Sequence, residues 1–235
     1  MTVLRDRSAR QTLSKCFYGC SLVTYKYYLF DLDGTLTDPG IGITNSVMYA
    51  LERFDIHVSD RSELYPFIGP PLDESFQRFF GFSESQCRKA IEYYRERYRD
   101  TGLFENSVYP GIPELLSSLK EKNITVALAT SKPYEFSVRI LRHFDLYDSF
   151  DFIGAATMDG SISRKCDVIK HLLNEIETDN TESVLMIGDR AQDINGAKTN
   201  GLKSAGVLWG YGSSDELLNA GADYLISRPE ELLYL

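Results

Sequence analysis

The chain has 235 residues, a mass of 26.7 kDa and a hydrophobic content of 43%, which is enough for one large core or for a core with an inserted segment. Its formal net charge of -9 and isoelectric point near 4.9 argue against non-specific binding to nucleic acid polymers or to an anionic membrane surface. The sequence contains no apolar run of about 18 residues, so we expect no membrane-spanning helix.

Residues 1–24 differ in composition from the rest of the chain. They are rich in basic residues but have no apolar segment followed by a small-residue cleavage site, so a secretory signal peptide is a poor fit. We predict an N-terminal extension ahead of a first strand that begins near Tyr25. The cysteines are scattered, with no Cys-x-x-Cys pair, which favours reduced thiols and a cytoplasmic location. They are Cys16, Cys20, Cys87 and Cys166.

The stretch FDLDGTLTD, residues 30–38, begins in the last residues of a predicted buried strand at 27–31. A carboxylate at the end of such a strand costs stability unless a cation pairs with it, so Asp31 and Asp33 indicate a site. Asp31 is a candidate nucleophile for phosphorus, and Asp33, on the same side of an extended chain, could protonate the leaving oxygen. Gly34 would let the backbone approach a phosphoryl group. Taken alone, Asp33-Gly34 is equally a common turn.

A block of helices is predicted over residues 41–106, directly after the first strand and its motif. Helices are predicted over 44–54, 72–80 and 84–99, and together they suggest a lid inserted after the first strand. The segment 67–71, which contains Gly69-Pro70-Pro71, is either a rigid wall facing the cleft or a loop that connects two helices. Its Phe67 would either stack on a nucleotide base or fill the core of the lid. A small acid such as phosphoglycolate would instead need a basic group, and the candidates are Arg53, Lys132 and Arg164.

After residue 123, short apolar runs alternate with helical patterns such as the one over 165–177. This alternation predicts parallel strands joined by right-handed crossovers, and hence a doubly wound, Rossmann-like α/β sheet in which strand 27–31 is central. The further strands are predicted at 124–130, 150–156, 183–189, 204–210 and 222–227.

Polar residues follow two of these strands, where the binding crevice of an open α/β sheet lies. Thr130 and Ser131 precede a helix expected to begin at Pro133; their hydroxyls could bind phosphate oxygens or merely cap the helix. Asp189 and Asp193 are four residues apart and would share one face of a helix, either as capping acids or as ligands. Carboxylates that converge at these strand ends would suit a hard divalent cation.

Lys165 opens the predicted helix over 165–177, where a positive charge is electrostatically unfavourable. It is either a solvated surface lysine or a functional one. The stretches DLDGT, ATSKP, SRKCD and GDRAQD, in this order, resemble the motifs of the haloacid dehalogenase (HAD) superfamily. The helical block resembles the small cap of its phosphoglycolate phosphatase-like and bacterial 5'-nucleotidase-like branch.

The resemblance implies a division of the chain and a role for each motif residue. It implies a catalytic core at 25–40 and 107–235 and a helical cap at 41–106, after the extension at 1–24. Asp31 is the implied nucleophile and Asp33 the implied general acid/base. The residues implied to bind phosphate are Gly34, Thr130, Ser131 and Lys165, and of these Thr130 and Lys165 also act in catalysis. The residues implied to bind Mg2+ are Asp31, Asp33 through its main-chain carbonyl, Asp189 and Asp193.

The implied function is a Mg2+-dependent phosphomonoester hydrolase that acts through an aspartyl phosphate on a small metabolite, such as a nucleoside monophosphate or phosphoglycolate. Asp33 argues against a dehalogenase, and Thr35 argues against the alternative of a sugar phosphomutase. A non-catalytic protein that binds a phosphorylated ligand is a further alternative. Ser131 departs from the Asn of many relatives. We expect a monomer or homodimer whose partner is a small phosphomonoester.

Overall fold

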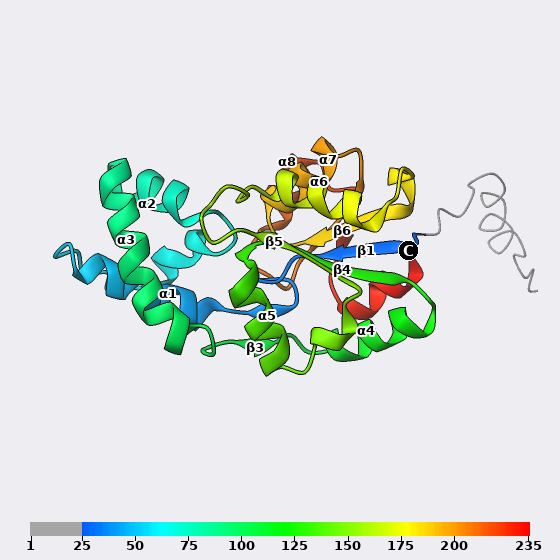
Figure 1. Cartoon of the computed structure of the whole chain (residues 1–235), viewed down its shortest axis with the longest axis horizontal. Helices are drawn as coiled ribbons and strands as arrows, with labels where there is room; N and C mark the ends of the chain where they lie inside the picture. Colours follow the sequence, from blue (N-terminus) through cyan, green and yellow to red (C-terminus); the bar gives the residue numbers. More distant parts are fainter. Residues whose placement is uncertain (1–24) are drawn as a thin grey trace, which may run out of the picture.

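A computed structural model describes residues 25–235, so the predicted N-terminal extension, with Cys16 and Cys20, lies outside the described residues. A six-stranded parallel sheet with the strand order β5-β4-β1-β6-β7-β8 forms the centre of the molecule (Figure 1). The prediction of a doubly wound, Rossmann-like α/β fold is therefore confirmed. The strands are β1 (Tyr27–Phe30), β4 (Thr125–Pro133), β5 (Phe152–Ala156), β6 (Val184–Gly188), β7 (Lys203–Val207) and β8 (Tyr224–Ile226).

β1 is central, as predicted, because its side chains are almost all apolar or aromatic and can be buried on both faces. It pairs with β4 on one side and β6 on the other, and Phe30 lies in register with Leu128 and Ile187. All three strands run parallel. Their carboxyl ends therefore meet at one edge, directly beside residues 31–33.

Helices cover both faces of the sheet. α6 (Lys165–Ile176) and α7 (Ala191–Thr199) pack on one face, above the sheet in Figure 1, and α8 (Ser214–Ala220) packs beside α7. α4 (Ile112–Glu121) and α5 (Tyr134–His143) pack on the opposite face. Within residues 25–235, no helix combines the length and the apolar character needed to cross a membrane.

A helical insert, residues 40–102, lies between the short strands β2 (Thr37–Asp38) and β3 (Ser107–Val108), which pair antiparallel. It forms the left-hand end of the molecule in Figure 1. Its elements are α1 (Gly40–Glu52), the 3-10 helix Arg61–Phe67, α2 (Leu72–Phe80), α3 (Glu84–Arg97) and the π-helix Tyr98–Gly102.

The predicted helix over 72–80 is confirmed, but the bounds of the other two differ from the prediction. α1 begins at Gly40 rather than at residue 44. At this start of the helix, the Gly40 amide donates a hydrogen bond to the Asp38 carboxylate at 3.0 Å. α3 ends at Arg97 and continues as the π-helix, a feature frequent at functional sites. The 3-10 helix Arg61–Phe67 was not predicted, since Pro66 lies within it.

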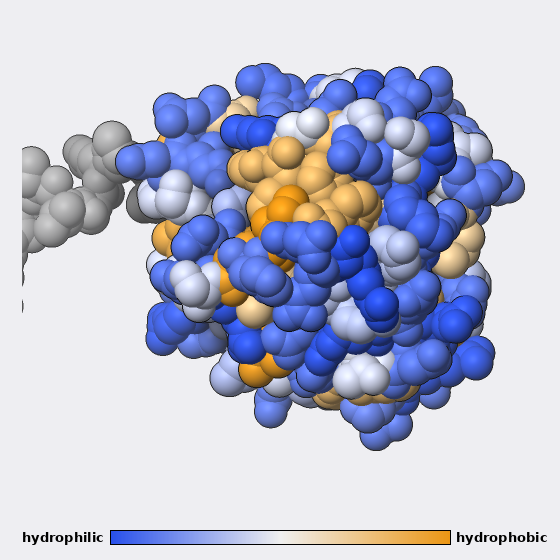
Figure 2. Space-filling model, turned by 90° about the vertical axis from the view of Figure 1, so that its left-hand side faces the viewer, coloured by the Kyte–Doolittle hydropathy of each residue, from blue (hydrophilic) through white to orange (hydrophobic). Residues whose placement is uncertain are grey.

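The insert has an aromatic core of its own. The ring of Phe76 lies 5.1 Å from that of Phe67 and stacks on that of Phe82 at 5.8 Å, measured between centroids. This core is continuous with the apolar cluster on the α4 and α5 face of the sheet. Figure 2 views the molecule from the end formed by the insert and shows an apolar patch on a mostly hydrophilic surface. Whether residues 41–106 form a separate cap domain stays a prediction.

Candidate active site

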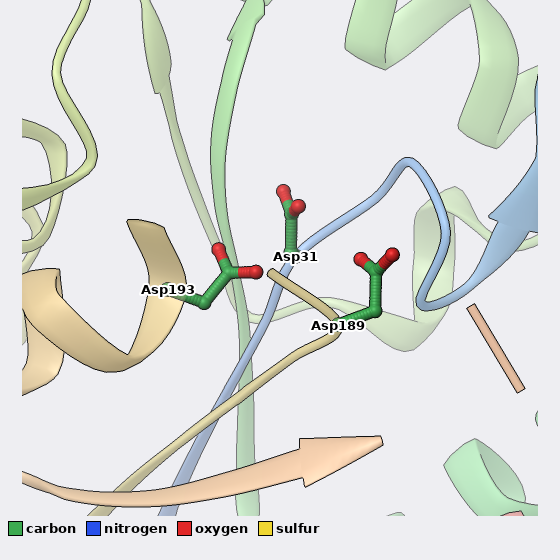
Figure 3. A group of neighbouring side chains, drawn as sticks. All are labelled: Asp31, Asp189 and Asp193. Carbon is green, nitrogen blue, oxygen red and sulfur yellow. The ribbon is translucent and has the colours of Figure 1, made fainter. Parts of the chain in front are cut away.

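Three buried carboxylates lie side by side at the edge where β1 and β6 end (Figure 3). Asp31 directly follows β1, Asp189 directly follows β6, and Asp193 lies in the first turn of α7. One oxygen of each carboxylate lies within 4.8 Å of an oxygen of each of the others. The convergence expected from parallel strand ends is thus observed, because β1 and β6 are neighbours in the sheet.

The argument that Asp189 and Asp193 share one face of a helix is wrong. The chain leaves β6 at Gly188 and enters α7 only at Ala191, so Asp189 lies in the connecting loop. Asp193 is the third helical residue, and its Oδ2 accepts a hydrogen bond from the Arg190 amide at 3.0 Å. The loop, rather than helical periodicity, brings the two carboxylates together.

Lys165 is buried among these carboxylates, and its alternative as a solvated surface lysine is wrong. Its Nζ lies 2.6 Å from Asp31 Oδ1 and 2.8 Å from Asp193 Oδ1, and it donates to the Ala129 carbonyl at 2.8 Å. Three protein oxygens therefore lie within 2.8 Å of this ammonium group. Burial alone would lower the pKa of Lys165, but the charges of Asp193 and Asp31 raise it above its ordinary value.

The carboxylates outnumber the cation beside them. Burial raises the pKa of Asp189 well above its ordinary value, and the charges of Asp193 and Asp31 add to this shift. Burial also raises the pKa of Asp193 to about 6, although the charge of Lys165 acts in the opposite direction. These carboxylates offer only oxygen donors, and the one lysine beside them does not balance their charge. A cluster of this kind fits a hard divalent cation, which binds carboxylate oxygens.

Asp189 is held in place by neighbours from two other segments. Its Oδ1 accepts a hydrogen bond from Thr35 Oγ1 at 3.2 Å, and its Oδ2 accepts one from the Tyr211 amide at 2.8 Å. Gly34 has a φ of +83°, and a Cβ built there would lie 2.2 Å from Asp189 Oδ2. A glycine is thus required for both its backbone conformation and the space that this carboxylate occupies.

Asp33 faces a different part of the site. Its Oδ2 lies 2.6 Å from Lys132 Nζ, and its side chain is not part of the group formed by the other three carboxylates. Burial raises the pKa of Asp33, and this effect outweighs the opposing charge of Lys132. Contact of the Asp33 main-chain carbonyl with a metal stays a prediction.

The predicted helix start at Pro133 is wrong by one residue. β4 extends through Thr130 and Ser131 to Pro133, which precedes the first residue of α5, Tyr134. The strand is irregular between Thr130 and Pro133, and Thr130 Oγ1 accepts a hydrogen bond from the Lys132 amide at 3.2 Å. Thr130 is buried, and Ser131 lies on the wall of the adjoining cavity.

A cavity of about 530 Å³ lies between the sheet edge and the helical insert. Asp33, Ser131 and Lys132 line it from the sheet side, and α3 lines it from the insert. The segment 67–71 contributes to the wall of this cavity, in agreement with the interpretation of this segment as a wall that faces the cleft. Phe67 itself is 2% exposed and packs in the aromatic core of the insert, which favours the core-filling alternative for this side chain.

Several contacts of the site were not anticipated from the sequence. Tyr98 OH accepts a hydrogen bond from Lys132 at 2.7 Å, and Arg190 donates to the Ile68 carbonyl, which links the insert to the loop after β6. Lys132 was one of three basic residues considered for a small acid such as phosphoglycolate, but its pairing with Asp33 was not predicted. Tyr98, 34 residues away, gave no signal, because the fold alone brings it to the strand end.

The sequence profile of the haloacid dehalogenase-like hydrolase family matches residues 28–207. A relative from Pseudomonas aeruginosa named 5'-nucleotidase is 48% identical over 193 residues, which cover 82% of this chain and 87% of that protein. A Mycobacterium tuberculosis protein named tyrosine-protein kinase PtkA is 39% identical over 80% of this chain and 63% of its own length. The crystal structure of a predicted phosphatase from Clostridium acetobutylicum superposes with a TM-score of 0.87 and 47% identity, covering 90% of this chain and all of that one.

Proposed function

The chain belongs to the haloacid dehalogenase-like hydrolase family and is a phosphatase, and on this premise we propose that it is a Mg2+-dependent phosphomonoester hydrolase. We propose further that it acts through an aspartyl phosphate on a nucleoside monophosphate or phosphoglycolate. The observation that carries the proposal is the pairing of Asp31 with Lys165 in a buried cluster, next to an Asp33 that turns toward the cavity.

In the proposed first step, an oxygen of the Asp31 carboxylate attacks phosphorus while the bond from phosphorus to the ester oxygen breaks. Lys165, 2.6 Å from Asp31, offsets the negative charge that gathers on the nucleophile and the phosphoryl oxygens. Asp33 donates a proton to the leaving oxygen. Its raised pKa supports this role, because a proton must be present on the acid at the start of the step.

In the second step, Asp33 takes a proton from water, and the water oxygen attacks the same phosphorus. The bond between phosphorus and Asp31 breaks, inorganic phosphate leaves, and the Asp31 carboxylate is restored. Asp33 Oδ1 is buried and has no hydrogen-bond partner among residues 25–235, so one oxygen of this acid is free to exchange a proton with a substrate or water. Thr130, Ser131 and Gly34 are proposed to contact the phosphoryl oxygens.

Asp31, Asp189 and Asp193 are the residues proposed to hold Mg2+, with the carbonyl of Asp33. When bound, the ion would supply positive charge that polarises the phosphoryl group. The chain's own contribution is to fix the ligands: Thr35 and the Tyr211 amide orient Asp189, and Lys165 and the Arg190 amide orient Asp193. The volume of the cavity, about 530 Å³, is in the range of small-molecule sites and supports a metabolite-sized substrate.

The test is phosphate release from a panel of esters: nucleoside monophosphates, phosphoglycolate, hexose phosphates and p-nitrophenyl phosphate. The purified protein is assayed with Mg2+, with a chelator, and with Mg2+ added back after chelation. We expect release that the chelator abolishes and Mg2+ restores, with a preference for nucleoside monophosphates or phosphoglycolate. An Asp189→Ala variant should lose both activity and response to Mg2+. Absence of release from every ester would contradict the proposal.

A further inference from the structure

The site contains a second buried lysine, to which neither the motif resemblance nor the mechanism above gives a role. Lys132 is 8% exposed and lies on the wall of the cavity. A buried ammonium group costs stability unless it is paired, so its partners and its unused hydrogen-bonding capacity indicate what it does.

Two of the three donors of Lys132 have partners. Its Nζ lies 2.6 Å from Asp33 Oδ2 and donates to Tyr98 OH at 2.7 Å, and the ammonium also lies 4.8 Å from the centre of the Tyr98 ring. Among residues 25–235, no third hydrogen-bond partner is found for it. By contrast, Lys165 has three protein oxygens within 2.8 Å of its Nζ. Lys132 therefore keeps one donor available beside the cavity.

The position of Lys132 relative to the reaction follows from its partner. Lys165 pairs with Asp31, on the side of the nucleophile, whereas Lys132 pairs with Asp33, on the side from which the leaving oxygen is protonated. Because this ammonium group lies 2.6 Å from the acid that faces the ester oxygen, it is placed to meet an oxygen on the carbon adjacent to the ester carbon. The two lysines thus divide the site between the nucleophile and the leaving group.

The helical insert fixes this ammonium group from the opposite side. Tyr98 opens the π-helix that follows α3, and it is 1% exposed and packed against Tyr94 and Phe136. The hydroxyl is therefore held rigidly, and it restricts where Lys132 can place its remaining donor.

We propose that Lys132, oriented by Tyr98, binds the leaving group of the substrate and selects esters that carry an oxygen acceptor close to the ester carbon. This inference rests on the proposed phosphomonoesterase function and adds a specificity residue to it. The acceptor is a carboxylate oxygen in phosphoglycolate, and a ribose ring oxygen or hydroxyl in a nucleoside 5'-monophosphate. p-Nitrophenyl phosphate has no such acceptor beside its ester carbon.

The test compares Lys132→Met with the wild type on three esters: a nucleoside 5'-monophosphate, phosphoglycolate and p-nitrophenyl phosphate. We expect kcat/KM for at least one metabolite ester to fall about 10- to 100-fold more than that for p-nitrophenyl phosphate, as for loss of a hydrogen bond to a charged group. The ester with the larger loss identifies the acceptor as carboxylate or ribose oxygen. Inhibition by the matching dephosphorylated alcohol should weaken in parallel.

Two further variants keep the outcome interpretable. Tyr98→Phe keeps the ring and removes only the hydroxyl, and it should show the same dependence on substrate with a smaller loss, about 3- to 10-fold. Lys170→Met removes an exposed lysine on α6 and should change no rate. Equal losses on all three esters in Lys132→Met, or in Tyr98→Phe where Lys132→Met does not fold, would overturn the inference. Failure of the proposed function would look different, because the wild type would then hydrolyse none of the esters.

Discussion

The two halves of the candidate site are built in different ways. The half around Lys165 is assembled at strand ends from β1, the loop after β6, α6 and α7, and carboxylates surround the lysine on two sides. The half around Lys132 joins the sheet edge to the helical insert, and an aromatic hydroxyl completes it. The first half depends only on the sheet and its crossover helices, whereas the second exists only when the insert is in place.

The difference suggests a division of labour. The invariable part of the chemistry, attack on phosphorus, would be placed where the sheet fixes the geometry. The variable part, the choice of leaving group, would be placed where an insert can change without disturbing the sheet. Substitutions in the first half should therefore affect every substrate and the binding of Mg2+, and substitutions in the second half should discriminate between substrates.

Replacement of the proposed nucleophile should have the largest effect. Asp31→Asn keeps the shape of the side chain but removes the charge that attacks phosphorus, so turnover of every ester should fall at least about 1,000-fold. Steady-state kinetics on two esters check this, with circular dichroism to confirm the fold. Asp148→Asn, at an exposed position, serves as the matched control. A variant of Asp31 that keeps a rate near that of the wild type would remove the nucleophile assignment.

A methyl group at Gly34 should disturb the metal half next most strongly. Gly34→Ala puts a Cβ 2.2 Å from Asp189 Oδ2 at a φ of +83°, so both the strained backbone and the clash should lower stability, by about 2–5 kcal/mol in total. Gly81→Ala is the control, because Gly81 has a φ of +65° but no atom within 4 Å of the added Cβ. It should cost only the backbone strain, about 1–2 kcal/mol.

Denaturant titrations of both glycine variants, each with and without Mg2+, separate these contributions. The loss of stabilisation by Mg2+ should appear in Gly34→Ala alone, since only that substitution displaces a proposed ligand. Equal effects of the two substitutions would show that the carboxylate cluster tolerates the displacement.

The smallest expected effect is a pH dependence of the metal-free protein. Burial raises the pKa of Asp193 from 3.8 to about 6, so the folded state binds this proton more tightly than the unfolded state. Stability from this group is full below about pH 4 and is lost as the pH rises through about 6, a change on the order of 2–3 kcal/mol. Unfolding of the chelated protein, followed across this range, should show the loss.

Mg2+ should reverse this trend, because it binds the ionised carboxylates. The rise in Tm on adding Mg2+ should be larger at about pH 7.5 than at about pH 5, where protons compete with the ion. Asp193→Asn provides the control, since it should abolish the part of the pH dependence that comes from this group. A rise in Tm that is the same at both pH values would argue against the carboxylates as the binding site.

Much of the fold could be predicted from the sequence. The order of strands and helices, the central place of β1 and the helix over 72–80 all follow from local apolar patterns, and the structure agrees with them. The errors lie at the ends of elements. α1 begins at Gly40 rather than at residue 44, and the Gly40 amide donates a hydrogen bond to the Asp38 carboxylate. β4 continues to Pro133, where the start of a helix was expected.

The sequence by itself determined that polar residues after the strands lie at one edge of the sheet. The reason is that apolar strands alternating with helices form a parallel sheet, whose carboxyl ends share an edge. Asp31 and Asp189 could be expected to meet on that basis, since each directly follows a buried strand. Tertiary structure alone decided that Lys165 is buried between Asp31 and Asp193, that Asp33 turns away to Lys132, and that Tyr98 reaches the same ammonium group. The physical reason is that these contacts join residues far apart in the chain, some between strand ends and crossover helices and others between the insert and the sheet edge, and such contacts leave no local pattern in the sequence.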